Sequence, residues 1–199
     1  MKRFLLALLT LTLLLAGCGL SEDDHPEAIP PENVPPGLLD PNPSTTTTGV
    51  ASGEGTTVTV YLVERSDQGA KLKAVDRQVA DPTKPGDRIN ALLSQATEDE
   101  TARGLTTAIP ADTVLLHTSF EQKDDHVLDI DVSKELFNVQ GEELATAFAQ
   151  FVWTVSKLAS VREVRFLVDG EPINAQDADG VEQDGPVSTA DYVDLAPDE

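Results

Sequence analysis

The chain has 199 residues and a strong excess of acidic side chains, with 35 Asp and Glu against 14 Lys and Arg. Nucleic-acid binding uses Lys and Arg to neutralise phosphates, so this balance argues strongly against DNA or RNA as a partner. It also argues against adsorption to anionic lipid. The simplest interpretation is that the acidity keeps an exposed protein soluble and monomeric, and a specific basic partner is the alternative.

The first seventeen residues have the pattern of an export signal. Lys2 and Arg3 precede an apolar run at 4–15 that only two threonines interrupt. A permanent membrane-spanning helix needs about 20 apolar residues, so this run is too short for one and has the length of a signal-peptide core. We therefore expect residues 1–17 to be removed on export.

The only cysteine of the chain stands directly after this signal. Leu15-Ala16-Gly17-Cys18 resembles the lipobox of bacterial lipoproteins. The resemblance implies cleavage between Gly17 and Cys18, acylation of Cys18 with palmitate-like chains, and a mature protein held at the extracytoplasmic face of the cell membrane. A plain signal peptide that happens to contain a cysteine is the alternative. With a single cysteine, an internal disulfide and a thiolate metal cluster are both impossible.

Residues 18–56 have the composition of a tether. Prolines recur through this segment and apolar residues are sparse. Proline favours extended backbone, and so few apolar side chains cannot offset the entropy lost on ordering, so we expect a disordered spacer between the membrane and a folded part. Thr45 to Thr48 could carry O-linked sugars, but a short polar linker explains the same residues.

Residues 57–195 have the patterning of a single domain. Period-2 alternation and β-branched residues predict strands, and apolar residues at a spacing near 3.6 predict helices. The expected strands are 58–63, 71–79, 113–120, 127–132 and 164–168, and the expected helices start at Gly86-Asp87 and at Glu142, the second ending at Ala159. The two strands 113–120 and 127–132 are expected to pair as an antiparallel hairpin. The order predicts an α+β two-layer sandwich in which both helices cover one face of a mixed or antiparallel sheet.

Several short stretches of this part resemble the GerMN domain, which occurs in the sporulation lipoprotein GerM and in the actinobacterial lipoprotein LpqB. The matching stretches are Leu92-Leu93, 104–110, 130–133, 151–155, 164–170 and 186–192. One departure is that many members have Gly-Pro after the first helix, where this chain has Ser94-Gln95-Ala96-Thr97. The backbone geometry at the end of that helix is therefore not given by the resemblance. The resemblance implies a fold like the ring-building motifs of secretion and sporulation machinery.

The resemblance also implies a function. GerMN domains are regarded as non-catalytic protein-interaction modules of the cell envelope, so no catalytic residue and no cofactor is expected here. The partner would be an envelope protein whose identity the sequence does not give, and assembly of several copies of the chain stays open. The alternative is an extracytoplasmic lipoprotein that binds a ligand or substrate.

Candidate catalytic and metal-binding residues give only weak signals. His25, His117 and His126 are scattered along the chain, and no serine lies in a nucleophile-elbow context. Asp129 and Asp131 share one strand face and could act as paired carboxylates or oxygen ligands, but alternating acids on the wet side of a strand are more often solvated. The loop 177–180 lacks most ligands of a calcium loop. We expect no metal site.

Trp153 is the one candidate for a partner surface. It lies near the edge of the apolar stripe of the second helix. Packing against the core is the favoured interpretation, whereas an exposed tryptophan beside an apolar rim would mark a binding surface, because aromatic residues are enriched in binding hot spots.

Overall fold

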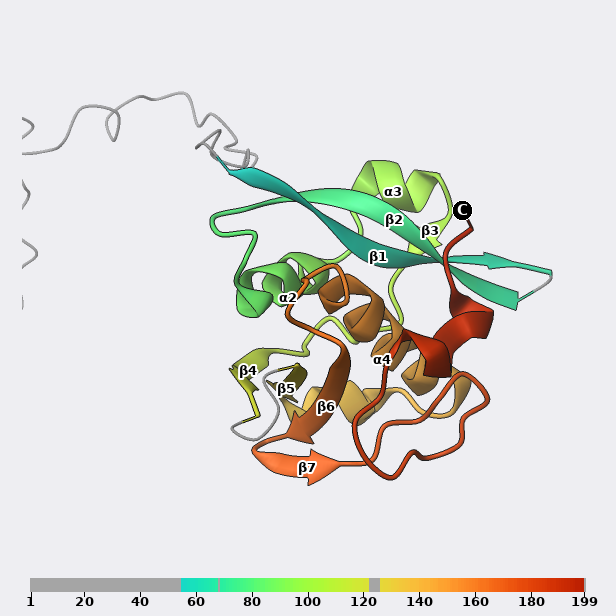
Figure 1. Ribbon diagram of the computed structural model, residues 1–199. Helices are drawn as coiled ribbons and strands as arrows, with labels where there is room; N and C mark the ends of the chain where they lie inside the picture. The colour runs from blue at the N-terminus through green and yellow to red at the C-terminus, as the bar shows by residue number, and fades with distance from the viewer. Residues whose placement is uncertain (1–54, 68, 122–125, 199) are drawn as a thin grey trace, which may run out of the picture. The chain divides into compact units, whose positions relative to one another are not determined.

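A computed structural model describes residues 55–67, 69–121 and 126–198, all within one compact unit of residues 51–199 (Figure 1). The predicted signal peptide, Cys18, His25 and the predicted tether up to residue 54 lie outside the described residues, whereas Thr56, the last residue of that predicted tether, begins the first strand.

The first sheet has three strands. β1 (Thr56–Ser66) and β2 (Gly69–Val79) form a long antiparallel hairpin, and β3 (Leu105–Thr106) pairs with the opposite edge of β1. Both long strands were predicted, with narrower limits. Ala70 and Leu72 of β2 are buried, and so are Val75 and Val79, so the buried face of the strand changes between Leu72 and Val75.

The second sheet has four strands in the order β4 (Leu115–Phe120), β5 (Val127–Val132), β6 (Glu163–Val168) and β7 (Glu171–Ile173). β4 and β5 form the predicted antiparallel hairpin, whereas β5 and β6 are parallel. β6 and β7 are antiparallel and are joined by Asp169-Gly170, both at positive φ. Such a two-residue turn matches the right-handed twist of a hairpin.

In the part of the chain that the structure describes, three α-helices accompany the sheets: α2 (Pro85–Leu93), α3 (Glu98–Ala102) and α4 (Glu142–Val155). Figure 1 shows α2 and α4 lying between the two sheets. α4 packs against β1, and its Phe148 and Phe151 rings lie 4.7 and 5.9 Å from the ring of Phe166 on β6. α4 is therefore covered on both sides.

The predicted α+β class is confirmed, and the arrangement differs from the expected single sheet with both helices on one face. The strands divide between two sheets with the helices between them. The reason lies in a second stripe of α4, Thr146, Gln150 and Thr154, whose exposed fraction is 0% although its residues are polar. A polar stripe on a helix need not face solvent, because polar side chains can be buried when they form hydrogen bonds inside the protein.

Hydrogen bonds from this polar stripe join α4 to the first sheet. Thr154 Oγ1 accepts a hydrogen bond from the Tyr61 amide at 3.2 Å, and Gln150 Nε2 donates to the Tyr61 carbonyl at 2.8 Å. Gln150 Oε1 accepts from the Ala108 amide at 2.8 Å and from the Thr107 hydroxyl at 3.2 Å. Gln150 therefore holds β1, α4 and the segment after β3 together.

The 3₁₀ helices η3 (Lys134–Asn138) and η4 (Thr189–Leu195) were not predicted. η4 begins with a capping box in which Ser188 and Asp191 satisfy each other's backbone amides. Its Tyr192 is fully buried and donates a hydrogen bond to the Gln176 carbonyl at 2.8 Å. The C-terminal segment is thereby fixed to the domain.

Candidate interaction surfaces

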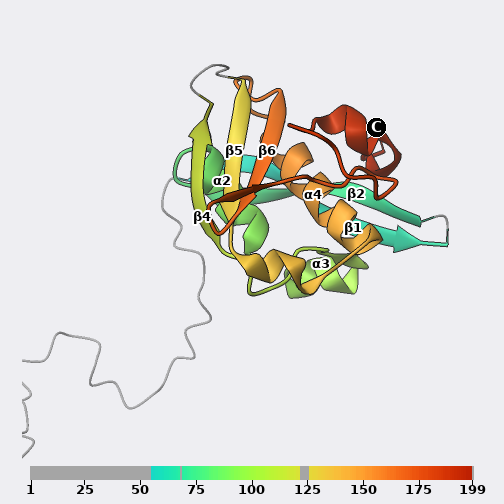
Figure 2. The ribbon, with the colours of Figure 1, turned by 90° about the horizontal axis from the view of Figure 1, so that it is seen from below.

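Exposed apolar side chains gather along the edge strand β4. Of the six large apolar residues that are exposed among the described residues, Val114, Leu116 and Phe120 lie on β4 or directly before it, with exposed fractions of 55, 49 and 36%. We call these three residues the β4 strip. Figure 2 shows β4 at the edge of the second sheet, beside β5 and β6. Its other edge pairs with no strand that the structure describes.

An irregularity in the pairing explains the exposure of Leu116. Leu115 lies opposite Val132 and His117 lies opposite Asp131, so Leu116 is an extra residue with no partner on β5. Such a bulge bends an edge strand and turns a side chain away from its usual face. Leu115 stays half-buried against the core, while Leu116 points to solvent.

A second apolar feature is an open groove of about 410 Å³ beside the opposite edge strand, β7. We call it the β7 groove. Phe137, on η3, is 42% exposed, whereas Leu144 at the start of α4 is buried. The lining residues are Phe137, Leu144, Pro172, Ile173, Asn174, Gln176 and Glu182.

The outer face of the second sheet carries the predicted acidic pair. Asp129 lies opposite Arg165, whose Nη1 is 3.5 Å from Asp129 Oδ1, and Arg165 Nη2 pairs with Glu121 at 2.6 Å. Burial raises the pKa of Asp129, an effect that Arg165 partly offsets and Glu121 reinforces. Asp131 accepts a hydrogen bond from the Gly170 amide. The two acids therefore have separate partners and do not form a carboxylate pair.

Trp153 is half-buried against the core. Its ring meets the Tyr61 ring edge-on at 5.9 Å, and Lys157 Nζ lies 5.5 and 5.8 Å from the centres of the Tyr61 and Trp153 rings. Trp153 Nε1 is buried and has no hydrogen-bond partner among the described residues. Trp153 therefore packs against the core, and its role in partner binding stays a prediction.

The remaining candidates do not converge. His117 is exposed on β4, and His126 Nδ1 lies 3.3 Å from the Ser160 carbonyl. Within 55–67, 69–121 and 126–198, no three His, Cys, Asp or Glu side chains are grouped closely enough to hold a metal ion. Asp177 Oδ1 accepts the amides of Asp179 and Val181, so this carboxylate organises its own loop. In the same ranges, no helix is long and apolar enough to cross a bilayer.

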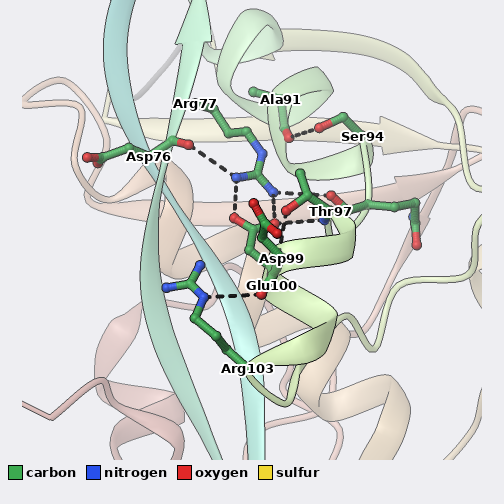
Figure 3. A network of polar contacts seen from close by, with 9 residues as sticks. Asp76, Arg77, Ala91, Ser94, Thr97, Asp99, Glu100 and Arg103 are labelled. Carbon is green, nitrogen blue, oxygen red and sulfur yellow. Dashed lines mark hydrogen bonds and ion pairs between the residues drawn. The ribbon is translucent and has the colours of Figure 1, made fainter. Parts of the chain in front are cut away.

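A buried ion pair that was not anticipated joins α3 to β2 (Figure 3). Arg77 Nη1 and Nη2 donate to the two carboxylate oxygens of Glu100 at 2.6 and 2.7 Å, and Nη2 also donates to the Gln95 carbonyl at 3.1 Å. Glu100 is also part of a capping box with Thr97. The T-x-x-E spacing at 97–100 is a sequence signal for this helix start. The network determines the path of the chain after α2 and is structural.

Comparison with known proteins identifies the family. The profile of the Germane family, described as "Sporulation and spore germination", matches residues 59–174, more than half of the chain. The chain therefore belongs to this family and is a GerMN-domain protein, as the sequence stretches above predicted. No curated protein matches the sequence.

Two solved structures have the same fold. The first GerMN domain of the sporulation protein GerM from Bacillus subtilis superposes with a TM-score of 0.53 at 18% identity, covering 68% of this chain and 98% of that one. The tandem GerMN domains of the same protein give a TM-score of 0.51 at 20% identity, covering 71% of this chain and 48% of that one. The chain thus spans about half the length of the tandem structure and nearly all of the single domain.

Proposed function

We propose that the chain is a lipid-anchored extracytoplasmic lipoprotein whose GerMN domain acts as a non-catalytic protein-interaction module in the cell envelope. The observation that carries the interaction role is the β4 strip. Apolar side chains gathered on an unpaired sheet edge are typical of protein-binding surfaces, because isolated soluble domains normally bury or blunt such edges. The anchor rests on the lipobox-like residues that end at Cys18.

For the alternative, a ligand- or substrate-binding lipoprotein, the candidate cavity is the β7 groove. Small-molecule sites usually enclose most of their ligand and place a few polar groups around it. The β7 groove is open, and four of its seven lining residues are apolar. This geometry favours contact with a macromolecule over enclosure of a small ligand.

Metabolic labelling with a palmitate analogue tests the anchor. Wild-type protein should carry the label and fractionate with membranes, whereas Cys18→Ser should lose both properties. Label that persists on Cys18→Ser would overturn the lipoprotein assignment.

Photo-crosslinking in intact membranes tests the interaction role. A photoreactive residue at position 116 should yield a discrete adduct, and one at Ala74, which is exposed on β2 of the other sheet, should not. The adduct should disappear when Val114 and Phe120 are both changed to Ser. An adduct at position 74 of equal yield, or none at position 116, would contradict an interaction role for the β4 strip.

A further inference from the structure

We propose that the β7 groove binds a segment of a partner protein in which an apolar side chain is flanked by Lys or Arg. This inference rests on the proposed interaction function and names the chemistry of the partner. It assigns a second surface, separate in the sheet order from the β4 strip, because β4 and β7 are the two opposite edges of the second sheet.

An exposed aromatic ring forms one wall of the groove. Phe137 follows Leu136, which is 0% exposed and anchors η3 in the core, so the chain turns the Phe137 ring outward. Pro172 and Ile173 on β7 supply further apolar surface. Val181, 57% exposed, directly precedes the lining residue Glu182. An apolar surface bordered by polar side chains is typical of a site that receives an apolar anchor.

Negative charge is concentrated in the C-terminal segment that supplies most of the groove's lining, and is not spread evenly along the domain. Residues 55–165 contain 12 Lys and Arg and 18 Asp and Glu, whereas residues 166–199 contain 10 Asp and Glu and no Lys or Arg. The second segment supplies five of the seven lining residues. A general need for solubility would not favour one segment, so the asymmetry indicates a complementary positive partner.

Two of these acids are available to a partner. Glu171 and Glu182 are exposed and form no ion pair with any residue that the structure describes. By contrast, Asp198 pairs with Lys73 and Asp191 caps η4. Glu182 lines the groove itself, and Glu171 precedes the lining residue Pro172. The available carboxylates thus lie where basic residues beside an apolar anchor would reach them.

The edge of β7 disfavours recognition by an added strand. Because Asp169-Gly170 form a two-residue turn, Val168 and Glu171 are the hydrogen-bonded pair that closes the hairpin, and Pro172 takes the next pair, opposite Leu167. At this position the backbone N–H of any other residue would point outward to an added strand, but Pro172 has no N–H to donate. The partner segment is therefore held by its side chains.

A peptide titration of the full mature chain, carrying Cys18→Ser to keep it in solution, tests the inference. The probe is a short synthetic peptide with one central Trp flanked on both sides by Lys. Amide chemical shifts should change at η3, β7 and residue 182. Phe137→Ser should weaken binding about tenfold or more, as expected for loss of a central aromatic contact.

Matched variants separate the groove from general charge attraction. Glu171→Gln with Glu182→Gln should weaken binding, and a peptide with Glu in place of Lys should not bind. Leu116→Ser, which removes an apolar side chain of β4 that is 49% exposed against 42% for Phe137, should leave binding unchanged. Binding that survives Phe137→Ser, shift changes centred on β4, or equal binding of the Glu peptide would overturn the inference. A retained β4 crosslink together with any of these results would refute the groove alone and leave the proposed function standing.

Discussion

Arg77 on β2 holds Glu100 on α3 in a two-pronged ion pair that is almost closed to solvent, with side-chain exposures of 14 and 7%. The Arg77 guanidinium and, to a smaller extent, the Thr97 amide lower the pKa of Glu100 to about 2, against the opposing effect of burial. Because the ordinary value is 4.5, the folded state favours the ionised carboxylate. Protonation of Glu100 therefore opposes folding.

The first prediction is that Glu100→Gln destabilises the domain by about 3 kcal/mol at pH 7, because it leaves the Arg77 charge partly buried and unpaired. A folded-state pKa below the unfolded value gives stability that is fully present above about pH 4.5 and is lost as the pH falls toward 2. The stability difference between wild type and Glu100→Gln should therefore shrink across this range.

Urea melts of both proteins at pH 7, 4 and 3 would measure this difference, and the comparison cancels the titration of the other carboxylates. A matched control is Glu98→Gln, an exposed acid in the same first turn of α3, which should change stability little at any pH. A difference that does not depend on pH would show that the ion pair is not what stabilises this connection.

The strands and main helices could be predicted because their apolar residues repeat with clear periods. Leu128, Ile130 and Val132 alternate with two acids, and the resulting strand has the predicted limits. The division into two sheets could not be predicted in this way. It depends on buried polar groups such as Gln150 and Thr154, whose partners are backbone atoms far away in the sequence.

The two candidate interaction surfaces also could not be predicted from the sequence patterns. Leu116 is exposed because a bulge shifts the register of β4, and Phe137 because a short 3₁₀ helix turns it outward. Neither the bulge nor the 3₁₀ helix produces a repeating pattern of apolar residues that could be recognised in the sequence. Trp153 was singled out by its residue type and its place near the edge of the helix stripe, and Asp129 was expected to be solvated although the structure half-buries it beside Arg165.

The second prediction concerns Gln150. Gln150→Leu would leave the Tyr61 carbonyl and the Ala108 amide buried without partners, at a cost of about 2–4 kcal/mol. Thr146→Val is the matched control, because Thr146 is equally buried on the same stripe and its hydroxyl bonds only to the Glu142 carbonyl of its own helix. Equal unfolding free energies of the two variants in urea would mean that Gln150 does not join α4 to the first sheet.

The third prediction concerns the exit of α2, where many family members carry Gly-Pro. Gln95 has a φ of 66°, a left-handed conformation that favours glycine, and the Arg77 bond to its carbonyl helps to hold it there. Gln95→Gly should raise stability by up to about 1 kcal/mol, the relief of strain exceeding the entropy cost of glycine. Ser94→Gly, at a φ of −67°, should lower it. Thermal melts in which Gln95→Gly and Ser94→Gly lower the melting temperature by the same amount would contradict this account.

The last prediction concerns the contact between α4 and the second sheet. Phe148 and Phe166 are each 1% exposed, and their rings lie 4.7 Å apart. Truncating either to Ala should cost about 3–5 kcal/mol through lost burial and the cavity left behind. Since the two rings touch, the double variant should cost less than the sum of the single variants, with a coupling of about 0.5–1.5 kcal/mol.

Alanine at these positions removes much of the 5–15 kcal/mol that holds a typical domain, so Phe148→Leu and Phe166→Leu provide milder versions of the same cycle. Asp129→Ala, on the outer face of the same sheet, is the control and should change stability far less. Urea melts of the full mature chain carrying Cys18→Ser would give all the free energies. Small effects that add independently would mean that α4 does not pack its aromatic face on β6, and that the helix is not enclosed between the two sheets.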